Sequence, residues 1–128
     1  MPADELFDTT AYPGAPAGQQ ELYLKENIFL NHFGQDLPRS QARLLWASQR
    51  GASTEAFGTP STYAAWKTIP SWYFISSGDQ IITPSSELAM AKRAKSRVTL
   101  FNGGSHLTLI SHPQAVTAVI TQAVWSVR

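Results

Sequence analysis

The stretch SWYFISSGDQIITPSSELAMAKRAKSRVTLFNGGSH, residues 71–106, decides the fold. It begins with a short apolar run, crosses a polar loop into good helix formers, and returns to a second apolar run before two glycines. Thr83 and Pro84 make a favourable N-cap and first-turn pair for the helix between the runs. Short continuous apolar runs are typical of strands buried on both faces of a parallel sheet. The stretch therefore predicts a strand, a helix and a second, parallel strand.

Each predicted strand is followed by a loop that carries one ionisable side chain. These are Asp79 after the first strand and His106 after the second. Ligands bind at the edge of an open α/β sheet where the carboxyl ends of the strands lie. An aspartate there can orient an imidazole through one ring nitrogen and leave the other to act as a base. Both residue types are also ordinary in loops, Asp79 as a turn residue after Gly78, so spacing alone leaves both interpretations open.

The chain on either side of this stretch has a less regular pattern. Residues 1–20 are rich in Pro, Gly, Ala and Gln and predict a loose arm. Residues 21–33 predict an extended start that becomes helical, and Pro38 predicts the first turn of a helix that ends near Gly51. Residues 51–63 have the composition of a loop.

A final helix is predicted after the His106 loop. Ser111 and Gln114 match a capping box, with Pro113 in the first turn. An apolar stripe with helical spacing follows, formed by Val116, Ile120, Ala123 and Val127.

Composition limits the classes of function. With 128 residues, 43% of them apolar and 15% charged, the chain fits one globular domain. A net charge of +1 gives no field to attract nucleic acid or an anionic membrane, and the basic cluster at 92–97 is expected to be a solvated helix end. The absence of cysteine excludes disulfides, thiolate zinc sites and cysteine nucleophiles. The acidic, polar N-terminus does not resemble a signal peptide, and no apolar run is long enough to span a membrane, so we expect a soluble, cytoplasmic protein.

The other two histidines predict no metal site. His112 fits the start of the last helix, and His32 fits a surface or core-edge position. No two histidines have helical ligand spacing beside a carboxylate, so neither a metal nor another cofactor is expected.

Several separated motifs resemble the α/β-hydrolase family, and more closely an esterase-like group within it. They are PSWY at 70–73, Asp79-Gln80-Ile81-Ile82-Thr83-Pro84, Met90-Ala91-Lys92-Arg93-Ala94 and Ser105-His106. Residues 25–50 also resemble the lid segment of that group, with its Asp-Leu-Pro and closing Ser-Gln. The resemblance covers nearly the whole chain after about Gln20.

The resemblance implies a partial α/β-hydrolase fold, consisting of the last two parallel strands with flanking helices and a helical lid segment. The implied division is a loose arm at 1–20, the lid-derived segment at 21–68 and the C-terminal part of the hydrolase core at 69–128. It further implies that Asp79 is the acid and His106 the base of a catalytic triad, and that Trp46 and Trp66 belong to the substrate pocket.

The sequence departs from the family where the nucleophile is concerned. The nucleophilic serine of this fold lies in G-x-S-x-G, upstream of the acid and the histidine, and no such motif occurs here. Ser71, Ser76, Ser77 and Ser105 lie on or beside the strands or next to His106, and we interpret all four as structural. We therefore expect the isolated chain to lack esterase turnover.

Three interpretations remain open at this point. The chain is a C-terminal portion of a serine hydrolase for small ester-like substrates, a non-catalytic interaction module, or one half of a split hydrolase. An incomplete sheet leaves an unpaired strand edge, which predicts self-association or pairing with another chain.

Overall fold

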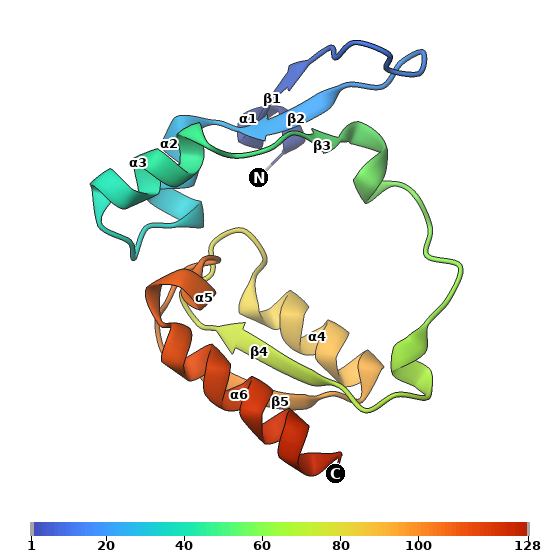
Figure 1. The fold of residues 1–128 in the computed structure, drawn as a ribbon, viewed down its shortest axis with the longest axis vertical. Helices are drawn as coiled ribbons and strands as arrows, with labels where there is room; N and C mark the ends of the chain where they lie inside the picture. The colour runs from blue at the N-terminus through green and yellow to red at the C-terminus, as the bar shows by residue number, and fades with distance from the viewer. Residues whose placement is uncertain (1, 128) are drawn as a thin grey trace.

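The computed structural model describes residues 2–127, which form an upper and a lower part joined by a long connection (Figure 1). The chain elements, in order, are α1 (Ala3–Leu6), β1 (Phe7–Thr10), β2 (Glu21–Leu24), α2 (Glu26–Ile28), the π-turn η1 (Phe29–Phe33), α3 (Arg39–Ala47), β3 (Ala52–Ser53), the 3₁₀ turns η2 (Thr54–Phe57) and η3 (Ala65–Lys67), β4 (Trp72–Ser76), α4 (Pro84–Ala94), β5 (Arg97–Phe101), α5 (Thr108–Ser111) and α6 (Pro113–Ser126).

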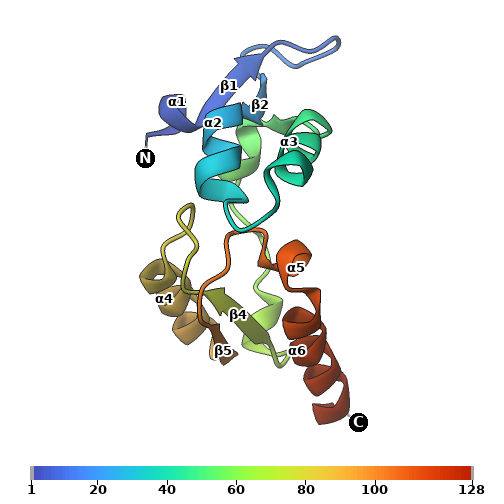
Figure 2. The same cartoon turned by 90° about the vertical axis from the view of Figure 1, so that its left-hand side faces the viewer.

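The lower part is the predicted strand–helix–strand unit. Strands β4 and β5 pair in parallel, with Trp72 opposite Arg97 and Ser76 opposite Phe101. Helices α4 and α6 lie on opposite sides of this pair (Figure 2). Thr83 caps α4 as predicted, because its hydroxyl accepts from the Ser86 amide and Pro84 is the first helical residue.

The upper part differs from the prediction for residues 1–20. Residues 11–20 do form a loop, but residues 3–10 form α1 and β1, and β1 pairs antiparallel with β2 from Phe7 opposite Leu24 to Thr10 opposite Glu21. Strand β3 adds to the other edge of β2, although the composition of residues 51–63 predicts a loop. Residues 21–33 do begin extended and become helical, as predicted.

The two parts meet through a small apolar core. Leu30, Leu37 and Ala42 from the upper part are buried, and Leu107 and Ile110 from the segment after His106 pack against them. In the lower part, Ile75 of β4 and Ala91 of α4 have no exposed surface. The loop that carries His106 is thus held between both parts.

The start of α6 corrects one local prediction. His112, and not Ser111, is the N-cap residue, and it makes no side-chain cap hydrogen bond. The Ser111 hydroxyl donates instead to Asp36 at 2.5 Å, which removes it from the predicted capping box. A tertiary contact has replaced the local one.

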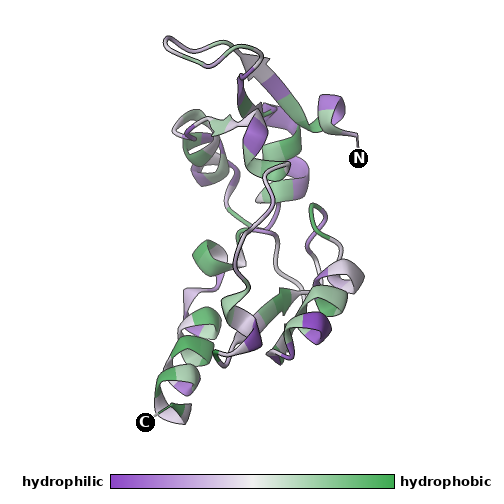
Figure 3. Cartoon of the chain, turned by 90° about the vertical axis from the view of Figure 1, so that its right-hand side faces the viewer, coloured by the Kyte–Doolittle hydropathy of each residue, from purple (hydrophilic) through white to green (hydrophobic). Residues whose placement is uncertain are grey.

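The apolar stripe of α6 is largely uncovered. Ile120 is 59% exposed and Val127 is 63% exposed, and no residue of this helix is buried. Apolar residues recur along the helix in the hydropathy view (Figure 3). On β5, Leu100 is 69% exposed, so only part of the two-stranded sheet is covered.

Among residues 2–127, no helix combines the length and the apolar character that crossing a membrane requires.

Candidate functional site

The structure brings Asp79 and His106 together. Nδ1 of His106 lies 2.7 Å from Oδ2 of Asp79. The two loops leave adjacent parallel strands, and backbone hydrogen bonds from Ser77 to Phe101 and from Gly78 to Gly103 continue the pairing beyond β4 and β5. The contact therefore follows from the sheet topology, as the sequence pattern predicted.

Asp79 is oriented by its own loop. The residue is 7% exposed, and its Oδ1 accepts from the amides of Ile81 at 2.8 Å and Ile82 at 3.0 Å. These bonds leave Oδ2 for the imidazole. A carboxylate oxygen in this position can accept from a ring N–H.

His106 is held by an aromatic contact as well as by Asp79. The ring centroid of Phe33 lies 4.7 Å from that of the imidazole. Phe33 ends the π-turn η1, and single π-turns occur frequently at functional sites. Among residues 2–127, Asp79 is the only hydrogen-bond partner of His106. When Nδ1 donates to Asp79, Nε2 carries the lone pair that a base needs.

Two glycines shape the loop before His106. Gly103 and Gly104 have φ values of +89° and +69°, which favour glycine strongly. A Cβ at Gly104 would also lie 2.3 Å from the Thr108 hydroxyl. Both positions therefore favour glycine through their positive φ, and Gly104 also because a side chain there would collide with Thr108.

An apolar cavity of about 660 Å³ opens beside the imidazole. Its wall is formed by aliphatic and aromatic side chains from both parts of the molecule, namely Leu6, Phe7, Leu22, Leu24, Phe33, Phe57, Ile81 and Ile82, together with Ala3, Thr54 and His106. Ligand sites are typically apolar hollows of this size with a few polar groups that fix orientation.

The two predicted pocket tryptophans do not line this cavity. The Trp46 indole donates to the Leu24 carbonyl at 2.9 Å and so links α3 to the end of β2. Trp66 lies at η3 beside Lys67, whose ammonium is 5.7 Å from the ring centroid. The aromatic residues on this cavity wall are instead Phe7 of β1, Phe33 of η1 and Phe57 of η2.

The serines near the pair make structural hydrogen bonds. Ser105 is 1% exposed and its hydroxyl accepts from the Leu107 amide at 2.9 Å. The Ser76 hydroxyl donates to Thr108 at 2.7 Å, and the Ser77 hydroxyl accepts from the Gly103 amide at 2.7 Å. None of these bonds directs a hydroxyl to the imidazole of His106.

The neighbouring ionisable groups respond to the buried acid. Burial and the negative charge of Asp79 raise the pKa of Glu87, while His106 opposes this effect. Burial and the charges of Glu87 and Asp79 raise the pKa of Tyr73. Burial is thus the main cause of both shifts, and the charge of Asp79 adds to each.

His32 and His112 lie outside the acid–base pair. His32 Nδ1 is 2.7 Å from the Gln80 side chain, so it touches the Asp79 loop and is not an isolated surface residue. His112 Nδ1 is 2.9 Å from Ser111 and 3.7 Å from Asp36. Within residues 2–127, no three histidine or acidic side chains come together as a metal-binding group.

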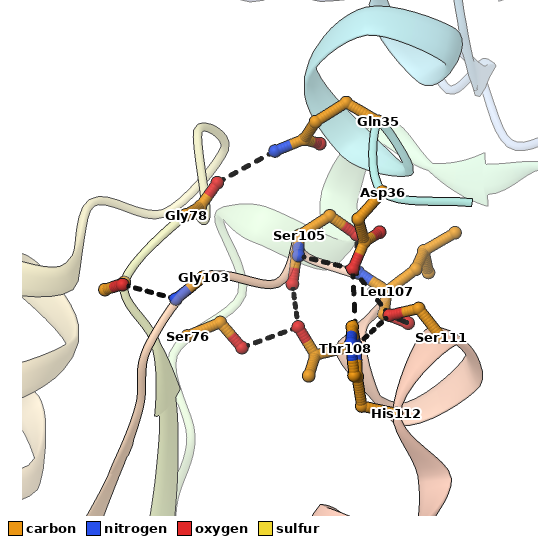
Figure 4. Close-up of polar contacts among 11 residues, drawn as sticks. Gln35, Asp36, Ser76, Gly78, Gly103, Ser105, Leu107, Thr108, Ser111 and His112 are labelled. Atoms are coloured by element: carbon orange, nitrogen blue, oxygen red, sulfur yellow. Dashed lines mark hydrogen bonds and ion pairs between the residues drawn. The ribbon is translucent and has the colours of Figure 1, made fainter.

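Asp36 and Gln35 were not identified from the sequence as site residues. Asp36 accepts from the Ser105 amide at 3.0 Å, and Gln35 donates to the Gly78 carbonyl at 2.8 Å (Figure 4). Their partners are far away along the chain, so no local pattern signals them.

A family model described as the alpha/beta hydrolase family matches residues 2–119. Among solved structures, polyneuridine aldehyde esterase is similar with a TM-score of 0.76 at 14% identity, over 96% of this chain and 51% of that chain. A histidine-to-alanine mutant of that esterase gives a TM-score of 0.74 at 14% identity, over 94% and 51%. No curated protein matches. The chain thus spans about half the length of the solved structures that it resembles, and at this identity the likeness concerns the fold.

Proposed function

The chain belongs to the alpha/beta hydrolase family, and on this premise we propose that it supplies the acid and the base of a serine-hydrolase triad whose nucleophile comes from outside these 128 residues. The observation that carries the proposal is the 2.7 Å contact between Asp79 and His106 beside an apolar cavity. The chemistry is acyl transfer to water from a small ester with an apolar group.

In this proposal Asp79 and His106 have separate tasks. Asp79 accepts from Nδ1, which fixes the tautomer and stabilises the imidazolium that forms during the reaction. Nε2 of His106 takes the proton of the attacking serine, gives it to the leaving alkoxide, and then activates the water that releases the acid. The apolar wall formed by Phe33, Ile81 and Ile82 receives the apolar part of the substrate.

The nucleophile is assigned to another segment on two grounds. The 128 residues contain no G-x-S-x-G, and the hydroxyls of Ser76, Ser77 and Ser105 are engaged in bonds that shape the loops. Losing the nucleophile of a triad costs about 10⁶ in rate, and losing one oxyanion donor costs about 10²–10³. The chain alone is expected to show no turnover.

We propose that the completing half docks on the uncovered part of the lower unit. Apolar side chains of α6 and β5 are exposed there, including Ile120 at 59%, Val124 at 45% and Leu100 at 69%. The occupant is a hydrolase half that carries G-x-S-x-G, since the chain covers 51% of the solved structures that share its fold. Such a half is either joined to this chain or a separate polypeptide.

The experiment compares the chain alone with the chain supplied with a hydrolase half that carries G-x-S-x-G, using p-nitrophenyl butyrate as substrate. We expect no hydrolysis by the chain alone and hydrolysis by the mixture or the fusion. His106→Ala should abolish it, and Asp8→Ala, at an exposed position of β1 outside the cavity wall, serves as the control. Turnover by the chain alone that requires His106, or by the mixture without His106, would contradict the assignment.

Docking is tested separately by size-exclusion chromatography with light scattering. The chain with the completing half should elute as one complex, and Ile120→Lys with Val124→Lys should prevent its formation. A complex of two copies of this chain that excludes the half would contradict the assigned occupant.

A further inference from the structure

The turn at residues 34–37 contacts both loops of the acid–base pair. The Gln35 side chain donates to the Gly78 carbonyl at 2.8 Å. One residue later, Asp36 Oδ2 accepts from the Ser105 amide at 3.0 Å. The two side chains thus lie above the two loops and reach one each (Figure 4).

The contacted backbone groups are next to the two proposed catalytic residues. Gly78 directly precedes Asp79, and Ser105 directly precedes His106. A hydrogen bond at the preceding residue restricts the rotations that set where the following side chain points. Gly78 also donates to the Gly103 carbonyl at 3.1 Å, so the two loops and the turn form one connected unit.

Asp36 is suited to this contact by its charge. Burial alone would raise the pKa of Asp36, but hydrogen bonds from Ser105 and Ser111 outweigh burial and lower it. The carboxylate is therefore ionised at neutral pH, and hydrogen bonds to a charged acceptor are stronger than neutral ones. Its side chain is 18% exposed, which limits competition from solvent.

The neighbouring Ser111 and His112 do not make Asp36 part of a second triad. A catalytic imidazole binds the acid through one nitrogen and the hydroxyl through the other. Here the Ser111 hydroxyl and the Asp36 carboxylate both lie at Nδ1 of His112, at 2.9 Å and 3.7 Å. The hydroxyl also donates directly to Asp36 at 2.5 Å, so its proton is held by the carboxylate.

The same segment forms part of the cavity wall. Phe33, two residues before Gln35, lines the apolar cavity and packs on the His106 ring. The position of the turn therefore sets two things together, the direction of the acid and the base and the distance from the base to the cavity wall.

We infer that Gln35 and Asp36 are positioning residues. Their two hydrogen bonds, which we call the Gln35–Asp36 clamp, attach the turn at residues 34–37 to the backbone just before Asp79 and just before His106. The clamp thereby fixes the position of the acid–base pair relative to the cavity wall. The inference rests on the proposed function for its catalytic meaning. The clamp itself is a statement about hydrogen bonds, and it can be measured without turnover.

The test follows the Nδ1 proton of His106 and the amide exchange of Ser105 by NMR in the full ¹⁵N-labelled chain. His106→Ala assigns the imidazole signal. In Asp36→Ala the Nδ1 signal should shift or broaden, and exchange of the Ser105 amide should accelerate about tenfold or more, as expected for the loss of a hydrogen bond to a charged group. Exchange in α4 should stay within about threefold of the unmodified chain.

Two variants separate positioning from a general loss of stability. Asp36→Asn keeps an oxygen for the Ser105 amide and should preserve the Nδ1 signal. Asp8→Ala removes a carboxylate on β1 that is 71% exposed and 3.9 Å from Lys25, and should leave both readouts unchanged. A folded Asp36→Ala chain with an unchanged His106 signal and Ser105 exchange would overturn the inference.

If Asp36→Ala does not fold, as judged by collapsed tryptophan indole signals, Gln35→Ala decides. It removes only the bond to the Gly78 carbonyl, and a shifted Nδ1 signal is expected. An unshifted signal in the folded Gln35→Ala chain overturns the inference. Failure of ester hydrolysis after completion bears on the proposed function alone, because neither readout depends on it.

Discussion

Substitution of Gly78 by alanine should separate the acid loop from the histidine loop. A Cβ at this position would lie 2.2 Å from the Gly104 carbonyl oxygen, whereas ordinary van der Waals contact begins at 3.4 Å. The carbons of Gly103 and Gly104 would each be 3.3 Å away. The obstruction is backbone in a tight loop, so it cannot be relieved by a change of rotamer.

The size of the effect follows from that overlap. The loops must move apart by about 1 Å, and inserting a methyl group into such a contact typically costs about 1–3 kcal/mol. A movement of this size also lengthens the 3.1 Å bond from the Gly78 amide to Gly103 and the 2.7 Å contact between Asp79 and His106. We therefore expect a loss of stability together with a weakened acid–base contact.

Urea denaturation followed by tryptophan fluorescence measures the first effect, and the Nδ1 proton signal of His106 measures the second. Gly58→Ala is the matched control, because no atom lies within 4 Å of its added Cβ and its φ of −98° suits alanine. Alanine there should be neutral or stabilise by about 0.4–1 kcal/mol through the unfolded state. A Gly78→Ala chain with unchanged stability and an unchanged Nδ1 signal would refute the reasoning.

Three further predictions concern single side chains. Thr83→Ala removes the cap of α4 and should lower the free energy of unfolding by about 1 kcal/mol; a urea series showing less than about 0.3 kcal/mol would contradict it. Because burial and the charge of Asp79 raise the pKa of Glu87 in the folded chain, Glu87→Gln should stabilise the folded chain at pH 7. This gain in stability should vanish as the pH falls below the unfolded pKa of Glu87, about 4.3. Urea midpoints at pH 7 and pH 4 test this, and a gain that persists at pH 4 would point to another cause. In the completed hydrolase, Asp79→Asn should lower kcat for ester hydrolysis by about 10⁴ with KM little changed, because asparagine favours the wrong imidazole tautomer. A decrease in kcat of less than about tenfold would show that Asp79 is not the triad acid.

The sequence predicted well those features whose partners are close along the chain or are fixed by sheet topology. The Thr83 cap is satisfied three residues later, by the Ser86 amide. The approach of Asp79 and His106 needed only the inference that their strands are adjacent and parallel, which the structure confirms. In both cases the interacting residues all lie within residues 71–106.

The features that were missed depend on partners in distant segments. Strand β1 forms because Phe7 to Thr10 pair with β2; its Phe and Thr residues favour a strand, but four residues before a Pro- and Gly-rich loop do not indicate their partner. Ser111 leaves its predicted capping box because Asp36, 75 positions earlier, offers a carboxylate. Trp46 donates to the Leu24 carbonyl, 22 positions earlier, and does not line the cavity. Propensity describes local preference, and a tertiary partner can override it.

The proposed acid–base pair is assembled within the part of the fold that the structure describes. The topology of β4 and β5 brings the loops together, the amides of Ile81 and Ile82 orient Asp79, and the Gln35–Asp36 clamp holds the backbone on both sides. None of these contacts uses the segment that would carry the nucleophile. A completing half would therefore meet an imidazole that is already oriented, which removes that ordering cost from the docking step. The Nδ1 proton signal should accordingly be present in the chain alone and keep its position when the half is added; its appearance only on addition would show that the nucleophile half, and not this chain, orders the pair.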